Sequence, residues 1–329
     1  MQSLPGSIGP TQSGVEHIAG VYAGSHLVKP KFPHWPNAWC TSWCDRAHRL
    51  DVPSWTSTSR VRRIGGEPAR ATASAQDLRA SAYLLRSRSA DGAVVCSQRI
   101  YAHRSLKHLL LSEFECTNQG AAAAEVELEE PGPSNIFGAD GEVLKGAPRD
   151  EAEATPVPSG IEGVGCSRLS VKVGETPTSA KAVVGECHSL CDGRRFAVPP
   201  RGRRLASCLS ARHSSVDDDE GEGEGIGVDP VDLARSSWRD ANASATSLYE
   251  RHEEAQRVLL RPGIEVEGDL ELARVINISM EAMLASYRED TIPGAGSGGL
   301  MSDGYAGNLL WDVETRMLPN FNLFYPAIR

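Results

Sequence analysis

Residues 298–319 read GGLMSDGYAGNLLWDVETRMLP, and this stretch is the most informative part of the chain. A glycine-rich segment leads into Trp311, Asp312 and Glu314, and an apolar segment follows. An aromatic ring can pack on the C–H face of a pyranose, and a carboxylate beside it accepts hydrogen bonds from the sugar hydroxyls. The stretch therefore suggests a sugar-binding pocket, although a lone Trp-Asp pair would more simply indicate a helix N-terminus with a core tryptophan.

The same stretch resembles glycoside hydrolase family 65, which holds acid trehalases, protein-glucosylgalactosylhydroxylysine glucosidases and the maltose, trehalose and kojibiose phosphorylases. Its members typically carry Gly-Gly-Leu, then Tyr-x-Gly, then Phe-Trp-Asp-x-Glu-x-Trp-Met-x-Pro. The matching positions in this chain are Gly298, Gly299, Leu300, Tyr305, Gly307, Trp311, Asp312, Glu314, Met317 and Pro319. Residues 279–290 (SMEAMLASYRED) are similar to the family's first barrel helix, and residues 101–118 are similar to a strand pair of its N-terminal domain. The resemblance is specific over about residues 270–326.

Three departures from the family pattern lie near the expected sugar site. Residues 308–310 read Asn-Leu-Leu where the glucosidase branch often has His-x-Phe, and Arg316 stands where the family usually has Trp. Residues 252–260 (HEEAQRVLL) lack the two tryptophans common in the family's linker helix. The resemblance implies that Trp311 and Asp312, which are both retained, hold the non-reducing glucosyl unit.

Residues 1–216 show the pattern of many short strands. Apolar runs cover residues 94–103, 106–118 and 122–130, and in the last run apolar residues alternate with glutamates, as in a strand with one solvated face. Asp91-Gly92 is a favourable hairpin turn before the first run. We expect an antiparallel β-sandwich over residues 1–216, with residues 131–160 as a surface excursion.

The second half of the chain reads as helical. The acidic, glycine-rich segment 217–225 is a linker by composition, and a helix should then run from Asp229 to about Leu260. A second helix is expected from about Gly268 to Arg288, with one apolar face. We therefore predict an acidic linker and linker helix over residues 217–262. By resemblance, residues 263–329 are the start of an incomplete (α/α)6 catalytic barrel, whose sugar pocket is rimmed by the glycine-rich loop 291–307.

Cleavage of a glycosidic bond commonly needs two carboxyl groups that flank it. Asp312 and Glu314 are two residues apart, so on a helix they face different directions and do not make that pair. By resemblance, the general acid is a glutamate on a later helix, beyond Arg329, and the base lies further still. We thus expect a chain truncated early in the barrel, in which Phe321, Leu323, Phe324 and Tyr325 lack partners and favour association, with homo-oligomerisation left open.

The resulting hypothesis is a glycosidase that acts with inversion on an α-glucoside, either trehalose-like or glucosyl-galactosyl-hydroxylysine-like. Its substrate-binding residues would be Trp311, Asp312, Glu314 and Tyr305, and the chain as given should bind sugar weakly and turn nothing over. The alternatives are an inverting disaccharide phosphorylase of the same family and a non-catalytic carbohydrate-binding or interaction protein. No metal, nucleotide or redox cofactor is assigned.

Composition limits the other classes. The net charge of −9 argues against nucleic acid as a partner, and no run of residues approaches the roughly 18 apolar residues of a membrane span. The N-terminus lacks the features of a secretory signal, so a cytoplasmic location is favoured. Eight cysteines are scattered along the chain, and we expect buried free thiols in a reducing compartment. The alternative is a split zinc site built from the C-x3-C pairs Cys40/Cys44 and Cys187/Cys191.

Overall fold

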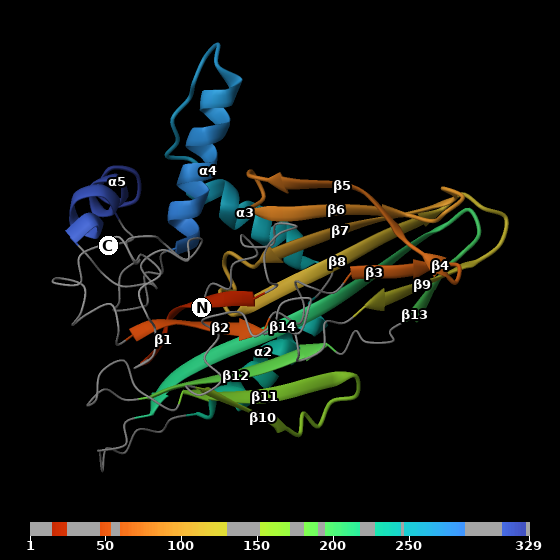
Figure 1. Ribbon diagram of the computed structural model, residues 1–329, viewed down its shortest axis with the longest axis horizontal. Helices are drawn as coiled ribbons and strands as arrows, with labels where there is room; N and C mark the ends of the chain where they lie inside the picture. The colour runs from red at the N-terminus through yellow and green to blue at the C-terminus, as the bar shows by residue number, and fades with distance from the viewer. Residues whose placement is uncertain are drawn as a thin grey trace, which may run out of the picture.

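The computed structural model of the chain describes residues 15–24, 47–53, 60–129, 152–171, 181–189, 195–217, 228–244, 247–286 and 311–326. Antiparallel sheets come first in the sequence and a few helices follow, which confirms the predicted order of fold classes (Figure 1). The barrel expected at the C-terminal end stays a prediction. No helix within the described ranges has both the length and the apolar character needed to cross a membrane.

The β-part is a sandwich of two sheets with a separate strand pair. The large sheet has the strand order β10-β11-β12-β14-β8-β7-β6-β5, and each neighbouring pair is antiparallel. Its strands are β5 (Arg70–Asp77), β6 (Ala82–Arg88), β7 (Val94–Ala102), β8 (Leu109–Asn118), β10 (Ala152–Val157), β11 (Val164–Val171), β12 (Lys181–Ser189) and β14 (Arg203–Asp217). The small sheet has the order β13-β9-β3-β4, with β3 (Arg60–Ile64), β4 (Glu67–Pro68), β9 (Ala124–Glu129) and β13 (Arg195–Val198). Strands β1 (Val15–Gly24) and β2 (Ala47–Pro53) pair with each other.

The core between the two sheets follows from the period of two along each strand. In β9, Val126 and Leu128 are buried, whereas Glu125 is exposed and Glu127 is partly covered, as the alternation predicted. The two buried residues pack with side chains of the large sheet and of β3 and β13, namely Ile64, Val94, Cys96, Phe114, Cys116, Val198 and Cys208. The predicted turn at Asp91-Gly92 is also confirmed, because Gly92 has φ +76° and the Asp91 carboxylate accepts a hydrogen bond from the Ala93 amide at 3.0 Å.

One predicted excursion contains a strand. Residues 130–151 lie outside the described ranges, but Ala152–Val157 forms β10 at the edge of the large sheet, so the loop prediction for this part is wrong. Pro156 is the reason that the sequence did not indicate a strand here, because a proline within a run of residues argues against a central strand. A proline lacks an amide donor, and an edge strand tolerates this because one of its sides has no neighbour.

Helix α2 (Pro230–Ala243) begins where the sequence predicted. The Asp229 carboxylate accepts a hydrogen bond from the Val231 amide at 2.9 Å and caps the helix, with Pro230 in its first turn. The helix covers the outer face of β11, β12 and β14, where a Cβ on Gly185 would lie 2.2 Å from the Pro230 carbonyl carbon. Glycine is therefore needed at position 185 for the helix to approach. The buried residues of α2 are Pro230, Val231, Ala234, Trp238 and Ala241.

The predicted single linker helix is two helices, so that expectation is wrong in detail. Helix α3 (Leu248–Leu259) follows α2 after a break. The Ser244 hydroxyl donates to the Asp240 carbonyl at 3.0 Å, and the Ser247 hydroxyl donates to the Ser244 carbonyl at 3.2 Å. Serine side chains that bond to nearby backbone groups offer an alternative to the helical pattern, and this explains the break.

The C-terminal helices pack on each other. Helix α4 (Leu270–Ser286) matches the second predicted helix, and a π-helical turn, η5 (Val313–Met317), continues into α5 (Leu318–Phe324). Phe321 and Tyr325 are buried against Met280 and Leu284 of α4, and Phe324 packs partly buried on the same cluster, so the expectation that these three aromatic residues lack partners is wrong. Leu323 fits that expectation because it is 71% exposed. Leu270, Leu272, Val275 and Ile278 in the first part of α4 are also exposed.

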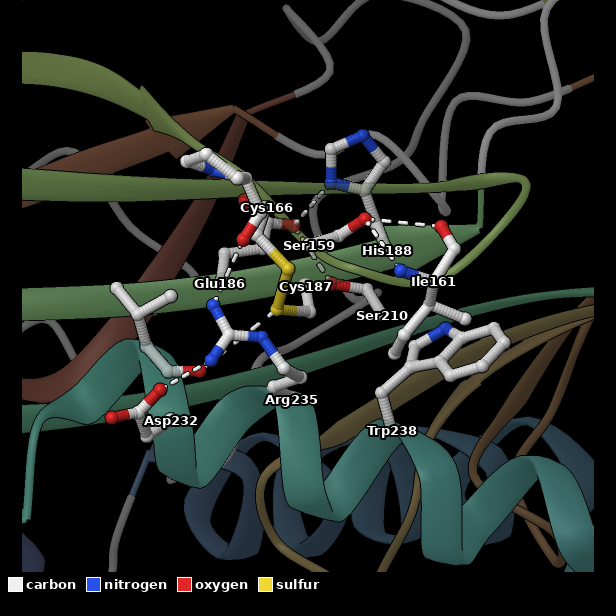
Figure 2. Close-up of a disulfide and its surroundings, with 12 residues drawn as sticks. Ser159, Ile161, Cys166, Glu186, Cys187, His188, Ser210, Asp232, Arg235 and Trp238 are labelled. Carbon is white, nitrogen blue, oxygen red and sulfur yellow. Dashed lines mark hydrogen bonds and ion pairs between the residues drawn. A yellow bond between two sulfur atoms is a disulfide. The ribbon is translucent and has the colours of Figure 1, made fainter.

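The cysteines differ most from the expectation. Cys96 and Cys116 face each other in the β7–β8 register and form a disulfide, and Cys166 and Cys187 join β11 to β12 in the same way (Figure 2). Within the described ranges no cysteine is free, so the prediction of free thiols is wrong; disulfides are typical of oxidising compartments. The disulfide also removes Cys187 from the alternative zinc site, whose other members, Cys40, Cys44 and Cys191, lie outside the described residues.

Candidate functional site

The candidate sugar-binding pair opens the last helical segment of the described chain. Trp311 and Asp312 directly precede the π-helical turn η5, and Val313 anchors the segment because it is buried. The wider turn has a local cause in Pro319, whose ring conflicts with the carbonyl four residues earlier in a regular α-helix. Single π-helical turns inside helices occur frequently at functional sites.

Trp311 and Asp312 share a neighbour that sequence reasoning noted only as a departure. The Trp311 side chain is 60% exposed, whereas the Asp312 carboxylate is largely covered. Arg316 Nε lies 3.6 Å from Asp312 Oδ1, and the Arg316 guanidinium lies 5.8 Å from the centre of the Trp311 ring. An exposed aromatic face, a carboxylate and a guanidinium thus lie within one turn and a half of helix. The spacing of four residues between Asp312 and Arg316 was the signal that could have predicted this contact.

The other predicted site residues are less informative. Glu314 is exposed on the π-helical turn, and Tyr305 lies outside the described residues, as does the glycine-rich loop 291–307. Asp312 is partly covered and Glu314 is exposed, and that the two carboxylates do not form a catalytic pair stays a prediction. Within the described ranges, no group of three or more metal-ligating side chains could hold a metal ion.

Sequence reasoning missed a second polar cluster, where the sandwich meets the helices. Arg104, in the loop between β7 and β8, donates from Nε to Gln256 Oε1 of α3 at 2.7 Å. Its Nη2 atom lies 3.3 Å from Glu281 Oε1 of α4, and Gln256 Nε2 donates to Glu281 Oε2 at 2.8 Å. All three side chains are buried. The cluster is assembled from residues up to 177 positions apart in sequence, so no local motif announces it.

Two buried histidines flank this cluster. The Arg104 amide donates to Nδ1 of His252 at 3.1 Å, so the proton of the neutral ring belongs on Nε2, which faces the Ala80 carbonyl at 2.5 Å. Burial lowers the pKa of His252 to about 4, and the backbone acceptor at Ala80 offsets this only in part. Burial, and to a smaller extent the neighbouring His252 and Arg251, lower the pKa of His103 to about 4. Both imidazoles are therefore neutral at pH 7.

A groove on the large sheet lies away from the candidate pair. It has a volume of about 560 Å³ and is bounded by strands β5, β6, β7, β8 and β14 and by Tyr249 of α3. The Arg99 guanidinium lies 3.7 Å from the centre of the Tyr249 ring and pairs with Glu113 at 3.0 Å. The Tyr101 hydroxyl donates to the other Glu113 oxygen at 2.9 Å. Because these groups satisfy one another, the groove presents no obvious catalytic group.

A third polar cluster stabilises the sheet beside the disulfide of β11 and β12. Glu186 Oε1 accepts hydrogen bonds from Arg212 Nη2 and from Ser210 Oγ, both at 2.7 Å, and all three residues are buried. Burial lowers the pKa of the neighbouring His188, against the opposing effect of the Glu186 carboxylate. Figure 2 shows Glu186 and His188 of β12 and Ser210 of β14 near the disulfide, with α2 below them in this view. The pair of Arg212 and Glu186 links β14 to β12 within the large sheet.

Comparison with known proteins gives two informative matches. No protein-family model matches the chain. The chain is 40% identical over 84 residues to a protein-glucosylgalactosylhydroxylysine glucosidase of Dictyostelium discoideum, which covers 26% of this chain and 12% of that protein. A solved structure named "Putative kojibiose phosphorylase from human microbiome" matches with a TM-score of 0.59 at 12% identity, over 93% of this chain and 38% of that chain.

The two matches carry different information. At 12% identity the structural match shows the fold alone, an N-terminal antiparallel sandwich followed by helices. The sequence match has the higher identity, 40%, but covers only 84 residues. The chain spans well under half the length of either protein. Taken together, the partial sequence match and the shared fold relate this chain to glycoside hydrolase family 65.

Proposed function

We propose that the chain is part of an enzyme that acts on an α-glucoside, and that Trp311 and Asp312 hold the glucosyl unit. The observation that carries this proposal is the exposed Trp311 ring next to the largely covered Asp312 carboxylate at the start of the last helical segment. The ring offers a flat apolar face to the sugar, and the carboxylate accepts hydrogen bonds from its hydroxyls. Tyr305 and Glu314 complete the proposed substrate-binding set.

The proposed reaction is hydrolysis with inversion. Inverting glycosidases use a general acid and a general base about 6.5–9.5 Å apart, with the attacking water between them. In this proposal neither Asp312 nor Glu314 takes these roles, and a glutamate from sequence beyond residue 329 is the acid. Residues 1–329 alone would then bind glucose weakly and release none from a glucoside. The proposed organisation is a sandwich over residues 1–216, a linker over 217–262 and a barrel that begins at 263.

Phosphorolysis is the second candidate reaction. The name of the structural match, a kojibiose phosphorylase, favours it, whereas the name of the sequence match, a glucosidase, favours hydrolysis. We prefer hydrolysis because the chain is 40% identical to the glucosidase over the matched residues and only 12% identical to the phosphorylase. A non-catalytic carbohydrate-binding protein is the third candidate, and it shares the Trp311–Asp312 pair with the other two.

The test measures glucose binding by the protein of residues 1–329, by NMR titration because weak affinity is expected. Trp311→Ala and Asp312→Asn should each weaken glucose binding at least about tenfold, the loss of a well-packed ring or of a charge-assisted hydrogen bond. Leu323→Ala is the control for the ring, since Leu323 is also an exposed apolar residue on the same segment, and Asp232→Asn on α2 is the control for the charge. Unchanged affinity in both site variants would contradict the assignment. Glucose release by wild-type residues 1–329 would contradict the placement of the acid.

A further inference from the structure

Two turns at one end of the large sheet contact the helices that lead to the candidate sugar site. The turn between β5 and β6 presents the Ala80 carbonyl to His252 of α3 and the Ser81 hydroxyl to Glu281 of α4. Ser81 has φ +46°, a backbone conformation that residues other than glycine rarely adopt, so packing must hold this turn in place. The loop between β7 and β8 presents Arg104 to both helices.

Glu281 is the centre of this contact. One of its carboxylate oxygens accepts from Arg104 and from the Ser81 hydroxyl, and the other accepts from Gln256. The side chains of Arg104 and Glu281 are only 6% and 7% exposed. Two charges are costly to bury, and their attraction offsets this cost only when the geometry is good and the other hydrogen-bonding groups are satisfied. The cluster therefore holds α4 against the sandwich in one defined position.

The same turn of α4 that carries Glu281 also holds the C-terminal segment. Met280 and Leu284 lie on either side of Glu281 in sequence, and both are buried against Phe321 and Tyr325. Arg104 also donates to the Leu284 carbonyl at 3.4 Å. Burial is the main cause that raises the pKa of the Tyr325 hydroxyl, and the Glu281 charge is the second. Tyr325 therefore lies within electrostatic reach of the cluster. The sandwich thus holds α4 through the polar cluster, and α4 holds α5 through apolar contacts.

Helix α5 is continuous with the π-helical turn η5, which the candidate pair directly precedes. The helical segment runs without a break from Trp311 through η5 to Phe324, so a shift of Phe321 on α4 moves Trp311 and Asp312 with it. We propose that Arg104 is a positioning residue for sugar binding: through Glu281 it fixes α4, and α4 fixes the segment that presents Trp311 and Asp312. This inference rests on the proposed function for its sugar-binding readout.

The experiment compares Arg104→Gln, Glu281→Gln, the double variant and Arg104→Lys in the protein of residues 1–329. The matched control is Arg212→Gln, which removes a guanidinium that is also buried and paired with a glutamate, but between two strands of the large sheet. Glucose affinity is measured by NMR titration under conditions where urea unfolding curves show each protein to be folded. Arg104→Gln and Glu281→Gln should each weaken glucose binding about tenfold, because sugar contacts depend steeply on position. The double variant should be little worse than either single one, since both act through one contact.

The variants Arg104→Lys and Arg212→Gln distinguish a loss of glucose affinity through misplaced binding residues from a loss through lower overall stability. Arg104→Lys keeps the charge beside Glu281 and should recover part of the lost affinity, whereas Arg212→Gln should lower stability and leave glucose affinity unchanged. Wild-type affinity in Arg104→Gln would overturn the inference. Equal weakening in Arg212→Gln would overturn it as well, because affinity would then follow stability rather than position.

A second readout does not depend on sugar. Hydrogen–deuterium exchange of residues 311–324 should become several-fold faster in Arg104→Gln while exchange of α2 stays at the wild-type rate, and Arg212→Gln should show no such change at 311–324. If the wild-type protein binds no glucose, the proposed function fails, and this exchange experiment still decides the inference. Unchanged exchange at 311–324 in Arg104→Gln would refute the mechanical link itself.

Discussion

Lowering the pH from 7.5 to 5 should destabilise the junction between the sandwich and α3, and His252 should account for a defined share of the loss. The ring is fully buried, with Nδ1 accepting from the Arg104 amide and Nε2 facing the Ala80 carbonyl. Protonation of Nδ1 would break the first contact and place a positive charge beside the Arg104 guanidinium. The other titratable rings that surround His252 are His103, Tyr101 and Tyr249.

The magnitude follows from the difference in pKa between the folded and unfolded chain. Burial lowers the pKa of His252 to about 4 in the folded protein, from 6.5 when the ring is free. Between these values the unfolded chain binds more protons, so the free energy of unfolding falls as the pH falls. The contribution is complete above about pH 6.5, and at pH 5 it has dropped by about 2 kcal/mol. His103, whose pKa is also about 4, should add a loss of the same order.

The assay is urea unfolding followed by circular dichroism at pH 7.5 and pH 5, for the wild-type protein and for His252→Gln. Glutamine keeps one acceptor and one donor but does not titrate, so the variant should be less stable at pH 7.5 and should lose about 2 kcal/mol less than wild type on acidification. Equal pH dependence in the two proteins would refute the reasoning. So would a histidine NMR titration that places the His252 pKa near 6.5.

Three further results are expected. Gly185→Ala should lower the free energy of unfolding by about 1–3 kcal/mol, measured by urea unfolding, because the new methyl group would clash with Pro230 unless α2 shifts. Trp238→Phe should cost about 1–3 kcal/mol in the same assay, because it leaves the buried Leu209 carbonyl without the indole N–H that donates to it at 3.2 Å. Cys187→Ser should remove the disulfide between β11 and β12 and lower the unfolding free energy by about 2–4 kcal/mol, whereas a reducing agent should then have less effect on the variant than on the wild type.

Local patterns in the sequence predicted the elements that depend on local physics. The alternation in β9, the Asp91-Gly92 turn and the Asp229 cap are set by neighbours within a few residues, and the structure confirms all three. The break at Ser244 and the edge strand around Pro156 were missed, because a weak local preference there is decided by packing and by position in the sheet. The disulfides were missed for a related reason, since strand register determines which cysteines face each other.

In the candidate site too, the residues of a local motif could be predicted from the sequence, and the residues that only the fold brings together could not. Trp311 and Asp312 could be identified from the sequence because they belong to a motif of contiguous residues, and the family relationship that the motif implied agrees with the sequence match. Arg104 and Glu281 could not be identified, because each is an ordinary polar residue until the fold brings the β7–β8 loop onto α4. A sequence pattern reveals groups that face a ligand more readily than groups that hold those groups in place.

A buried ion pair at the junction has a consequence that an apolar contact would lack. Dispersion and burial have little directional preference, so an apolar contact alone restricts the orientation of a helix less than hydrogen bonds do. The Glu281 carboxylate, in contrast, is satisfied only when Arg104, Gln256 and the Ser81 hydroxyl all reach it together. A binding residue must be held within about half an ångström of its productive position by packing and by hydrogen bonds around it. The polar cluster fixes α4 on the sandwich, and the segment that carries the candidate sugar site packs on α4.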